Sequence, residues 1–281
     1  MSHLGSYLNR YRDAVSSEIW ISDAYLRSSM PRTQGVLDLL GRVRHPGPRL
    51  IADLGCGPGN NTELIAQRWP EALVIGVDSS RDMIAAARER ERPGRLEFRQ
   101  ADLTEWQPGP SFDIVLLNAV LQWIPDHCAL LPQLAALLAP GGVLGFQMPG
   151  RLPGRSPNVY VLDIAREMTD EPQWRDQLSG VYTSHDLLDP MGYITALGDL
   201  GLRAEAWETR YAYPLAGGGR LVEHASGAVL RPALARLAPP AAERFLAEFS
   251  RRVGLACPPQ VIGGESVEVF HQSRVFAVGQ S

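Results

Sequence analysis

A glycine-rich turn early in the chain limits its fold more than any other feature. The apolar run Leu50–Leu54 stops at three glycines in five residues, Gly55, Gly57 and Gly59, and the apolar side chains of Glu63–Trp69 then recur at helical spacing. This order is typical of a strand, a tight turn and a helix. Glycine allows positive φ angles and lacks a Cβ that would block a ligand, and the helix offers free N–H groups at its start. We therefore expect a polar ligand, a nucleotide or a relative of one, against this turn.

An acidic residue stands in register with the turn. The next apolar run, Leu73–Val77, ends at Asp78. This is about the ~20-residue distance at which an acidic side chain meets ribose hydroxyls in mononucleotide-binding βαβ units. The dinucleotide pattern needs its third glycine where Asn60 stands, so the sequence favours a compact cofactor over one that carries a pyrophosphate.

Strand and helix patterns alternate over the first half of the chain. We expect strands at residues 50–54, 73–77, 96–99, 112–117, 142–147, 204–211 and 274–278, and helices at 36–43, 63–69, 81–90, 129–138, 159–168 and 193–200. Alternation at these lengths predicts an α/β fold with a doubly wound, mostly parallel, seven-stranded sheet that binds its ligand at the carboxyl ends of the strands. After Gly150 the rhythm breaks, which indicates an inserted, mainly helical cap.

We therefore divide the chain into three parts. Residues 1–44 form an N-terminal helical extension or lid, residues 45–149 the cofactor-binding core, and residues 150–281 the cap helices plus the last strands of the core. Apolar side chains at helical intervals within residues 7–20 predict an amphipathic helix. That helix either packs on its own domain, closes over the substrate, or is exchanged with a neighbouring subunit in a homo-oligomer.

Composition narrows the function classes. The formal net charge of −4 comes without a block of like charge, so a nucleic-acid partner is not expected. The three cysteines, Cys56, Cys128 and Cys257, lack metal-ligand or disulfide spacing, so we expect no metal site. Neither a signal sequence nor a membrane-spanning run is recognisable, which favours a cytoplasmic protein with a small-molecule substrate. All of the basic residues are arginine, a usage associated with GC-rich bacterial genomes.

Several motifs together resemble a known enzyme family. They are Asp53–Asn60, Asp78 with Ser79 and Ser80, Asp102, and Phe112–Val115 leading to Asn118 and Ala119. In these the chain resembles the class I S-adenosylmethionine-dependent methyltransferases. It is more narrowly similar to the trans-aconitate 2-methyltransferases, in Asn118–His127, Gln147–Gly150 and Trp207–Tyr211. The resemblance implies a Rossmann-like core that binds S-adenosyl-L-methionine and releases S-adenosyl-L-homocysteine.

The resemblance also implies roles for single residues. In the family the glycine turn faces the methionine part of the cofactor, the acidic end of the second strand holds the ribose, and the carboxylate after the third strand reads the adenine. The cofactor-binding positions carried over are Asp53, Gly55, Gly57, Gly59, Asn60, Asp78, Ser79, Met83, Asp102, Leu103, Asn118, Ala119 and Trp123. Asp78 and Asp102 could instead cap the turns that follow them, and Met83 could be a core residue.

The methyl acceptor is less well determined. Arg32, Arg231 and Arg274 match family arginines, and guanidinium groups suit carboxylates. A carboxylate acceptor is already ionised at neutral pH and needs no base. The family's Arg-x-Arg-Pro is Arg32-Thr33-Gln34-Gly35 here, and the predicted cap departs from the family at His224 and elsewhere. These departures favour a changed acceptor, such as a bulkier secondary metabolite. A small organic acid is the other acceptor class expected, and O-methylation of trans-aconitate itself stays an alternative.

Other acceptor chemistries therefore stay open. An apolar or prenylated natural product methylated at carbon, through a carbocation and with or without cyclisation, would need aromatic walls. A hydroxyl acceptor would need a base, for which His127 is the candidate, although a structural hydrogen bond is an equal alternative. The substrate-contacting candidates are Trp20, Tyr25, Arg32, Trp123, Tyr182, His224, Arg231 and Arg274. From another class, the chain could be a cofactor-binding scaffold without methyl transfer.

Overall fold

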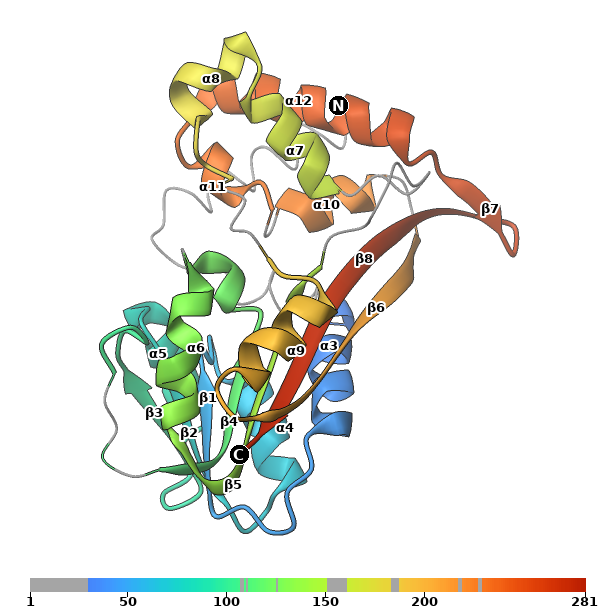
Figure 1. Cartoon of the computed structure of the whole chain (residues 1–281). Coiled ribbons are helices and arrows are strands. Elements are labelled where there is room, and N and C mark those ends of the chain that lie inside the picture. The colour runs from blue at the N-terminus through green and yellow to red at the C-terminus, as the bar shows by residue number, and fades with distance from the viewer. Residues whose placement is uncertain are drawn as a thin grey trace. The chain divides into compact units, whose positions relative to one another are not determined.

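The computed structural model describes residues 30–106, 109, 111–124, 126–150, 161–182, 187–216, 219–226 and 229–281 (Figure 1). The described strands form an eight-stranded sheet in the order β3-β2-β1-β4-β5-β8-β6, and β7 pairs with β8 outside this path. The strands are β1 (Leu50–Leu54), β2 (Leu73–Asp78), β3 (Leu96–Gln100), β4 (Phe112–Asn118), β5 (Leu138–Pro149), β6 (Arg203–Ala216), β7 (Gln260–Ile262) and β8 (Glu265–Gln280). The seven strands of the path are those expected from the sequence.

Most neighbouring strands run parallel. The pairs β1–β2, β2–β3, β1–β4 and β4–β5 are parallel, whereas β8 is antiparallel to β5. Central strands of such a sheet are covered on both faces, so their residues form nearly continuous apolar runs. Residues of β1 and β4 accordingly show little or no exposure, as in Ile51, Ala52, Val115 and Leu117. The doubly wound, mostly parallel fold is confirmed.

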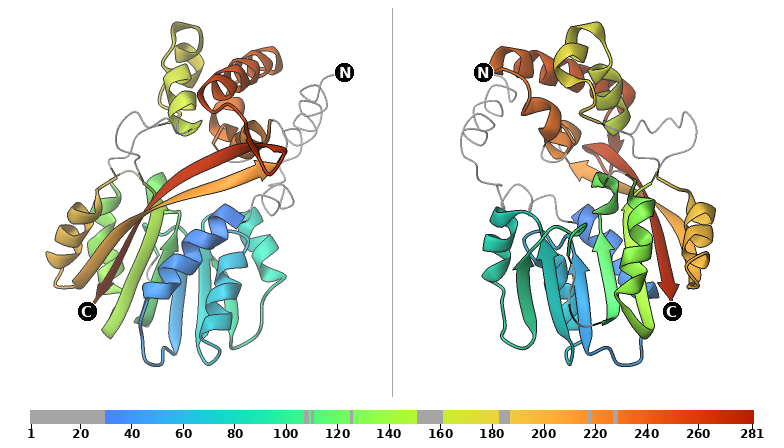
Figure 2. Two further views of the ribbon diagram at one scale, coloured as in Figure 1. Left: turned by 90° about the vertical axis from the view of Figure 1, so that its right-hand side faces the viewer. Right: turned by 60° about the vertical axis from the view of Figure 1, so that its left-hand side comes forward.

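Helices cover both faces of this sheet. They are α3 (Met30–Arg42), α4 (Asn60–Arg68), α5 (Arg81–Arg88), α6 (His127–Ala136) and α9 (Pro190–Gly198), with a short 3-10 helix η1 (Leu121–Trp123). Figure 2 shows α3 and α4 on one side of the strands and α6 and α9 on the other. On the first face, Leu39 and Val43 of α3 approach Gly145 of β5. On the second, Tyr193 of α9 packs edge-on against Phe146 of β5.

The strand order reverses between β1 and β4. From β1 the chain moves outward through β2 and β3, and then returns to form β4 on the opposite side of β1. Leu54 at the end of β1 pairs with both Val77 of β2 and Leu117 of β4. Connections that leave in opposite directions open a crevice at the carboxyl ends of these strands, which is where ligands bind in doubly wound sheets. The glycine turn after β1 and the end of β4 both lie at this edge.

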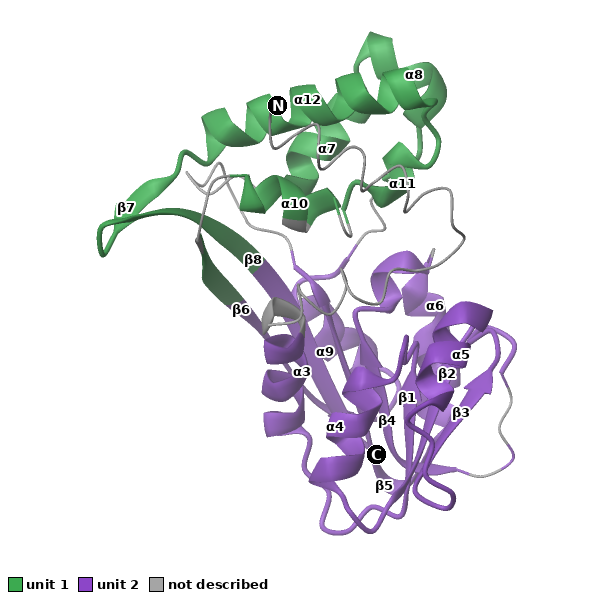
Figure 3. Cartoon of the chain, turned by 180° about the vertical axis from the view of Figure 1, so that it is seen from behind, with its two compact units in different colours: residues 1–28, 152–184, 210–272 green, residues 29–151, 185–209, 273–281 purple. Residues whose placement is uncertain are grey.

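The chain divides into two compact units (Figure 3). The sheet unit comprises residues 29–151, 185–209 and 273–281, and the helical unit comprises residues 1–28, 152–184 and 210–272. α3 belongs to the sheet unit, although the sequence grouped residues 1–44 as one extension. Its Val36, Leu39 and Leu40 are buried there, which explains the assignment.

The helical unit has its own apolar core. Its helices are α7 (Val161–Thr169), α8 (Pro172–Leu178), α10 (Arg220–Ser226), α11 (Arg231–Leu234) and α12 (Pro239–Ala256). Trp174 of α8 packs edge-on against Phe245 of α12, with 5.2 Å between ring centroids. The buried carboxylate of Glu268 accepts hydrogen bonds from the N–H groups of Gly219 and Leu221, which satisfies free donors at the start of α10.

Two features of the last strands were not expected from the sequence. β8 spans Glu265–Gln280, far beyond the strand expected at 274–278, and it forms a hairpin with β7. Gly263 and Gly264 both have positive φ angles and connect the two strands. A two-glycine loop of this kind is a recognised hairpin signal, and Val261-Ile262-Gly263-Gly264 carries it.

Candidate functional site

The three glycines of the turn after β1 have different surroundings. All three have positive φ angles, between 55° and 84°. A Cβ at Gly55 would lie 2.3 Å from Val120, and one at Gly59 would lie 2.7 Å from the Phe98 ring, whereas one at Gly57 would meet nothing within 4 Å. Gly55 and Gly59 therefore permit close packing of neighbouring elements. Gly57 is the glycine that leaves open space in front of the backbone.

Asp78, the last residue of β2, ties the turn to the next helix. Its Oδ2 accepts a hydrogen bond from the N–H of Gly57 at 2.9 Å, and its Oδ1 accepts one from Ser80 N–H at 2.9 Å. Ser80 in turn caps α5, because its hydroxyl accepts from the N–H of Met83. Each carboxylate oxygen can accept a second hydrogen bond, so the capping role does not prevent Asp78 from also holding a ligand hydroxyl. Ser79 beside it is exposed.

Asp53 of β1 is buried inside the sheet unit. Its side chain is 1% exposed, and Oδ2 accepts a hydrogen bond from the hydroxyl of Thr62 at 2.7 Å. This contact joins β1 to α4 behind the glycine turn. Burial raises the pKa of Asp53 to about 6, because desolvation disfavours the charged form, while the Thr62 hydrogen bond acts in the opposite direction.

The end of β4 forms the other side of the crevice. Ala119 has φ 57°, a left-handed conformation that costs a non-glycine residue about 1–2 kcal/mol. Its N–H donates to Gln147 O at 2.8 Å, and its carbonyl accepts from the Gln122 side chain at 2.8 Å. The conformation is thus held from both sides, as strained residues at functional sites are. Beside it, Asn118 Oδ1 accepts a hydrogen bond from the Gln147 carboxamide.

Comparisons with known proteins agree with this arrangement. A family model described as "Methyltransferase domain" matches residues 51–142. The chain is 40% identical over 266 residues to a trans-aconitate 2-methyltransferase of Streptomyces avermitilis. The aligned region covers 92% of this chain and 96% of the relative. This chain belongs to the S-adenosylmethionine-dependent methyltransferases.

A second curated relative supports this family. A trans-aconitate 2-methyltransferase of Rhodopseudomonas palustris is 41% identical over 245 residues, or 87% of this chain and 93% of the relative. Among solved structures, the YcgJ protein of Bacillus subtilis superposes with a TM-score of 0.57 at 13% identity, covering 89% of this chain and 98% of that one. This last likeness shows the fold alone. The methyltransferase uses S-adenosylmethionine, as expected from the sequence.

The crevice offers chemistry that suits this cofactor. S-adenosylmethionine presents hydroxyl and ammonium donors, which need acceptors in the protein. Within the described residues, Asn60 Oδ1 on α4 and Gln122 Oε1 on η1 are buried acceptors without a hydrogen-bond partner. A buried, unpartnered acceptor costs about 1–3 kcal/mol until a donor arrives. Together with Asp78 and the open face of Gly57, these acceptors suit a ribose-bearing amino acid derivative.

The remaining cofactor positions are spread over neighbouring loops. Asp102, after β3, is exposed, and its Oδ1 accepts from the N–H and hydroxyl of Thr104 at 2.9 and 2.7 Å, contacts that lower its pKa. This is the turn-capping alternative, although Oδ2 can still accept from a ligand. Leu103 packs at the edge of the core, and Met83 is buried on α5. Both placements suit structural roles as well as contact with an adenine ring.

The structure favours the structural alternative for His127 over a role as base. The side chain is 2% exposed, and its Nε2 lies 2.8 Å from the hydroxyl of Tyr193 on α9. The same hydroxyl accepts from Leu188 N–H and lies 3.3 Å from Met148 Sδ. Burial raises the pKa of Tyr193 above its ordinary value, which makes proton loss from this hydroxyl harder. His127 therefore anchors α6 to α9 within the apolar core.

Two of the three arginines belong to the sheet unit. Arg274 of β8 is 3% exposed, and its Nη1 donates to Gln147 Oε1 at 2.7 Å. Gly35 of α3 lies against its stem, since a Cβ there would be 2.9 Å from Arg274 Cδ. Arg32 stands one helical turn before Gly35 on α3, and its side chain lies outside the described part. Arg231 is exposed on α11 of the helical unit.

The aromatic and histidine candidates are less well placed. Trp123 on η1 is 67% exposed, so it is available to a ligand. Tyr182 donates its hydroxyl to Val229 O at 2.8 Å inside the helical unit. Trp20 and Tyr25 lie outside the described residues, as does the side chain of His224 on α10. Their predicted contacts with substrate stay predictions.

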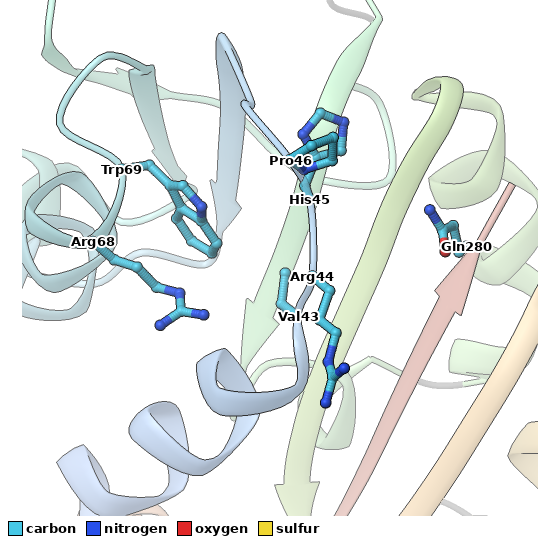
Figure 4. Close-up of a pocket in the computed structure, with 7 residues that line it drawn as sticks. All are labelled: Val43, Arg44, His45, Pro46, Arg68, Trp69 and Gln280. Carbon is cyan, nitrogen blue, oxygen red and sulfur yellow. The ribbon is translucent and has the colours of Figure 1, made fainter.

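A separate pocket lies at the opposite edge of the sheet (Figure 4). It has a volume of about 460 Å³ and is lined by Val43, Arg44, His45, Pro46, Arg68, Trp69 and Gln280. The loop Arg44–Pro46 leads to the start of β1, and Gln280 pairs with Val143 of β5, six positions before the carboxyl end at Pro149. Since cofactors bind at the carboxyl ends of the strands, this pocket is not the cofactor site.

Sequence reasoning missed two side chains that organise the site. Thr62 and Gln147 were not assigned roles, yet one holds Asp53 and the other connects Asn118 to Arg274. For Gln147 there was a signal, because it is a polar residue within the otherwise apolar run Gly142–Met148. A buried polar side chain is kept where its hydrogen bonds are satisfied.

Neither a membrane-spanning helix nor a cluster of metal ligands is found in the part of the chain that the structure describes. No helix there is both long and apolar enough to cross a membrane. Among the same residues, no three His, Cys, Asp or Glu side chains gather to hold a metal ion.

Proposed function

We propose that this methyltransferase transfers the methyl group of S-adenosylmethionine to a carboxylate oxygen of a small organic acid, forming a methyl ester. One observation carries the proposal: relatives about 40% identical over nearly their whole length are named trans-aconitate 2-methyltransferases. Trans-aconitate is therefore the first acid to test. The altered residues noted around Arg32 and His224 favour an acid that differs from it in shape.

When bound, S-adenosylmethionine would supply a methyl group on a positively charged sulfur. An ionised carboxylate would displace the sulfur in line at the methyl carbon, and S-adenosylhomocysteine would leave. Such an acceptor requires no general base, and this agrees with the buried position of His127 against Tyr193. The protein's contribution is to hold the two reactants at contact distance, which can be worth about 7–11 kcal/mol. Asp78 and Gly57 are proposed to fix the cofactor.

Arginines are proposed to hold the acid. Arg274 is buried at the carboxyl edge of the sheet, where it pairs with Pro149 of β5. Arg32 lies on the adjoining helix α3. A buried guanidinium binds a carboxylate more strongly than an exposed one does, because less water competes. We propose that Tyr182, His224 and Arg231 of the helical unit select the acceptor. We also propose that the enzyme is cytoplasmic and that its acceptor is a small molecule.

The test is product identification. The purified protein is incubated with methyl-labelled S-adenosylmethionine and, separately, with trans-aconitate, with other di- and tricarboxylates of similar size, and with apolar prenylated compounds. The proposal expects label in an acid product that alkali cleaves, since esters hydrolyse under those conditions. Label fixed in a carbon position of an apolar compound, with none in any acid, would overturn it in favour of C-methylation.

A further inference from the structure

Three polar side chains form a line across one face of the sheet. Asn118 at the end of β4 pairs in register with Gln147 of β5, so their side chains share a face. Gln147 pairs with Phe276 of β8, and Arg274 stands two residues earlier on that strand, on the same face and diagonally opposite. Hydrogen bonds join all three: Arg274 to Gln147 and Gln147 to Asn118.

The direction of each hydrogen bond in this line is determined by the arginine. A guanidinium can only donate, so Gln147 must turn its oxygen toward Arg274 and its amide nitrogen toward Asn118. Asn118 must then present its oxygen to Gln147, which directs its own amide nitrogen away from the line. Reversing Gln147 would bring donors face to face in a buried place, because Gln147 is 1% and Arg274 3% exposed. Unsatisfied donors of this kind are strongly disfavoured.

The far end of the line opens on the crevice. Asn118 is half-buried, and the segment after it reaches Gly55 of the glycine turn, where Val120 lies against the backbone. A positive charge at the inner end and an amide donor at the outer end suit an anion. Sulfonium methyl transfer brings two carboxylates to such a place, that of the cofactor's amino acid end and that of the acid acceptor.

We propose that Arg274, Gln147 and Asn118 form a polarised relay that holds the Asn118 amide as a donor to a carboxylate at the methyl-transfer site. Gln147 is its positioning residue. If the carboxylate belongs to the acid acceptor, the proposal rests on the proposed function; if it belongs to the cofactor, it does not. Because carboxylates from both sources have the same chemistry, the experiment must separate them.

The test reverses the relay with Gln147→Glu. The introduced carboxylate accepts from Arg274 and offers a second acceptor to Asn118, so the Asn118 side chain must turn its nitrogen inward and its oxygen outward. An outward oxygen repels a carboxylate. We expect its binding to weaken on the order of tenfold to a hundredfold, the range for a charge-assisted hydrogen bond. Asn118→Asp places an oxygen outward directly and gives the same result by an independent substitution.

A matched control exists on β8, the strand that carries Arg274. Gln280 of β8 also accepts a hydrogen bond from an arginine, Arg203, at 2.9 Å, and lies at the opposite end of the sheet. Gln280→Glu therefore introduces the same charge beside the same type of partner. It should leave all binding constants unchanged.

Two measurements distinguish the two carboxylates. Calorimetry compares S-adenosylhomocysteine with methylthioadenosine, which lacks the amino acid end, and steady-state kinetics give KM for the acid substrate. Loss of S-adenosylhomocysteine affinity with unchanged methylthioadenosine affinity assigns the relay to the cofactor. A raised KM for the acid with unchanged S-adenosylhomocysteine affinity assigns it to the acceptor. The relay proposal is overturned if Gln147→Glu and Asn118→Asp both fold and leave the S-adenosylhomocysteine affinity and the KM for the acid unchanged. It is also overturned if they weaken the binding of S-adenosylhomocysteine and of methylthioadenosine alike.

Discussion

At the scale of single residues, the glycine turn contains two glycines that permit close packing and one that leaves room for a ligand. Gly55 and Gly59 have close neighbours, Val120 and Phe98, whereas Gly57 faces open space and donates its N–H to Asp78. The three positions are indistinguishable in the sequence, because the neighbours that distinguish them come from distant strands and loops. Sequence reasoning could predict that a ligand approaches this turn, but not at which glycine.

Alanine substitutions should separate these roles. Gly57→Ala places a Cβ in the open space, so we expect weaker binding of S-adenosylhomocysteine and a stability loss of about 1–2 kcal/mol from the positive φ. Gly59→Ala should add about 1–3 kcal/mol to that loss, because its Cβ meets the Phe98 ring. Urea unfolding and calorimetry on both variants provide the check. Equal affinity for Gly57→Ala and wild type would contradict the assignment.

Asp53 should make stability depend on pH. Its pKa is raised from 3.8 to about 6 in the folded protein, so between about pH 4 and pH 6 the folded state keeps a proton that the unfolded state releases. Stability therefore falls as pH rises through this window, by about 3 kcal/mol from this group alone. In Asp53→Asn the side chain cannot ionise and still accepts from Thr62.

The measurement is urea unfolding of both proteins from pH 4 to pH 7. Other carboxylates titrate in the same range, so the informative quantity is the variant's free energy of unfolding minus that of the wild type. This difference should increase with pH. A constant difference would show that Asp53 is not perturbed.

At the scale of elements, α3 illustrates how a helix is fitted to a buried arginine that is proposed to hold the acid. Gly35 lies against the buried Arg274, whereas Gly41 of the same helix has nothing within 4 Å of a would-be Cβ. Glycine within a helix costs about 1 kcal/mol relative to alanine. The helix thus gives up stability at Gly35 for space beside an arginine, a reason that the helical pattern of residues 36–43 does not reveal.

Paired substitutions test this interpretation. Gly41→Ala should stabilise the protein by about 1 kcal/mol and leave acid turnover unchanged. Gly35→Ala should lose that gain and raise KM for the acid, because its Cβ would displace Arg274. Thermal unfolding and steady-state kinetics on the two variants suffice. A Gly35→Ala protein as stable and as active as Gly41→Ala would show that the contact with Arg274 has no functional importance.

Strand ends were harder to predict from the sequence than strands themselves. The core strands have continuous apolar runs because both faces are buried, and these runs identified them. β8 is different in its first half, where Glu265, Ser266, Glu268 and Gln272 interrupt the apolar residues. Glu268 is polar yet buried, because it caps α10. A tertiary role of this kind hides the strand from any periodicity argument.

At the scale of the whole molecule, the sequence predicted the sheet unit better than the helical unit. The doubly wound, mostly parallel sheet follows from the alternation of strands and helices and from the handedness of parallel connections, and both are local properties. The helical unit is assembled from segments 152–184 and 210–272, and its contacts, such as Trp174 with Phe245, join residues far apart in the chain. The same contrast holds for function, since the cofactor motifs lie within residues 53–123 and the proposed acceptor residues are spread from residue 20 to residue 274.

Calorimetric titration with S-adenosylhomocysteine tests the cofactor site most directly, in the wild type and in two variants with the same charge change. Asp78→Asn alters the carboxylate that joins Gly57 to the start of α5, and Asp82→Asn alters an exposed carboxylate in the first turn of that helix. We predict one binding site per chain, affinity lowered by about tenfold or more in Asp78→Asn, and no change in Asp82→Asn. A folded Asp78→Asn protein that binds as tightly as the wild type would contradict the location of the site.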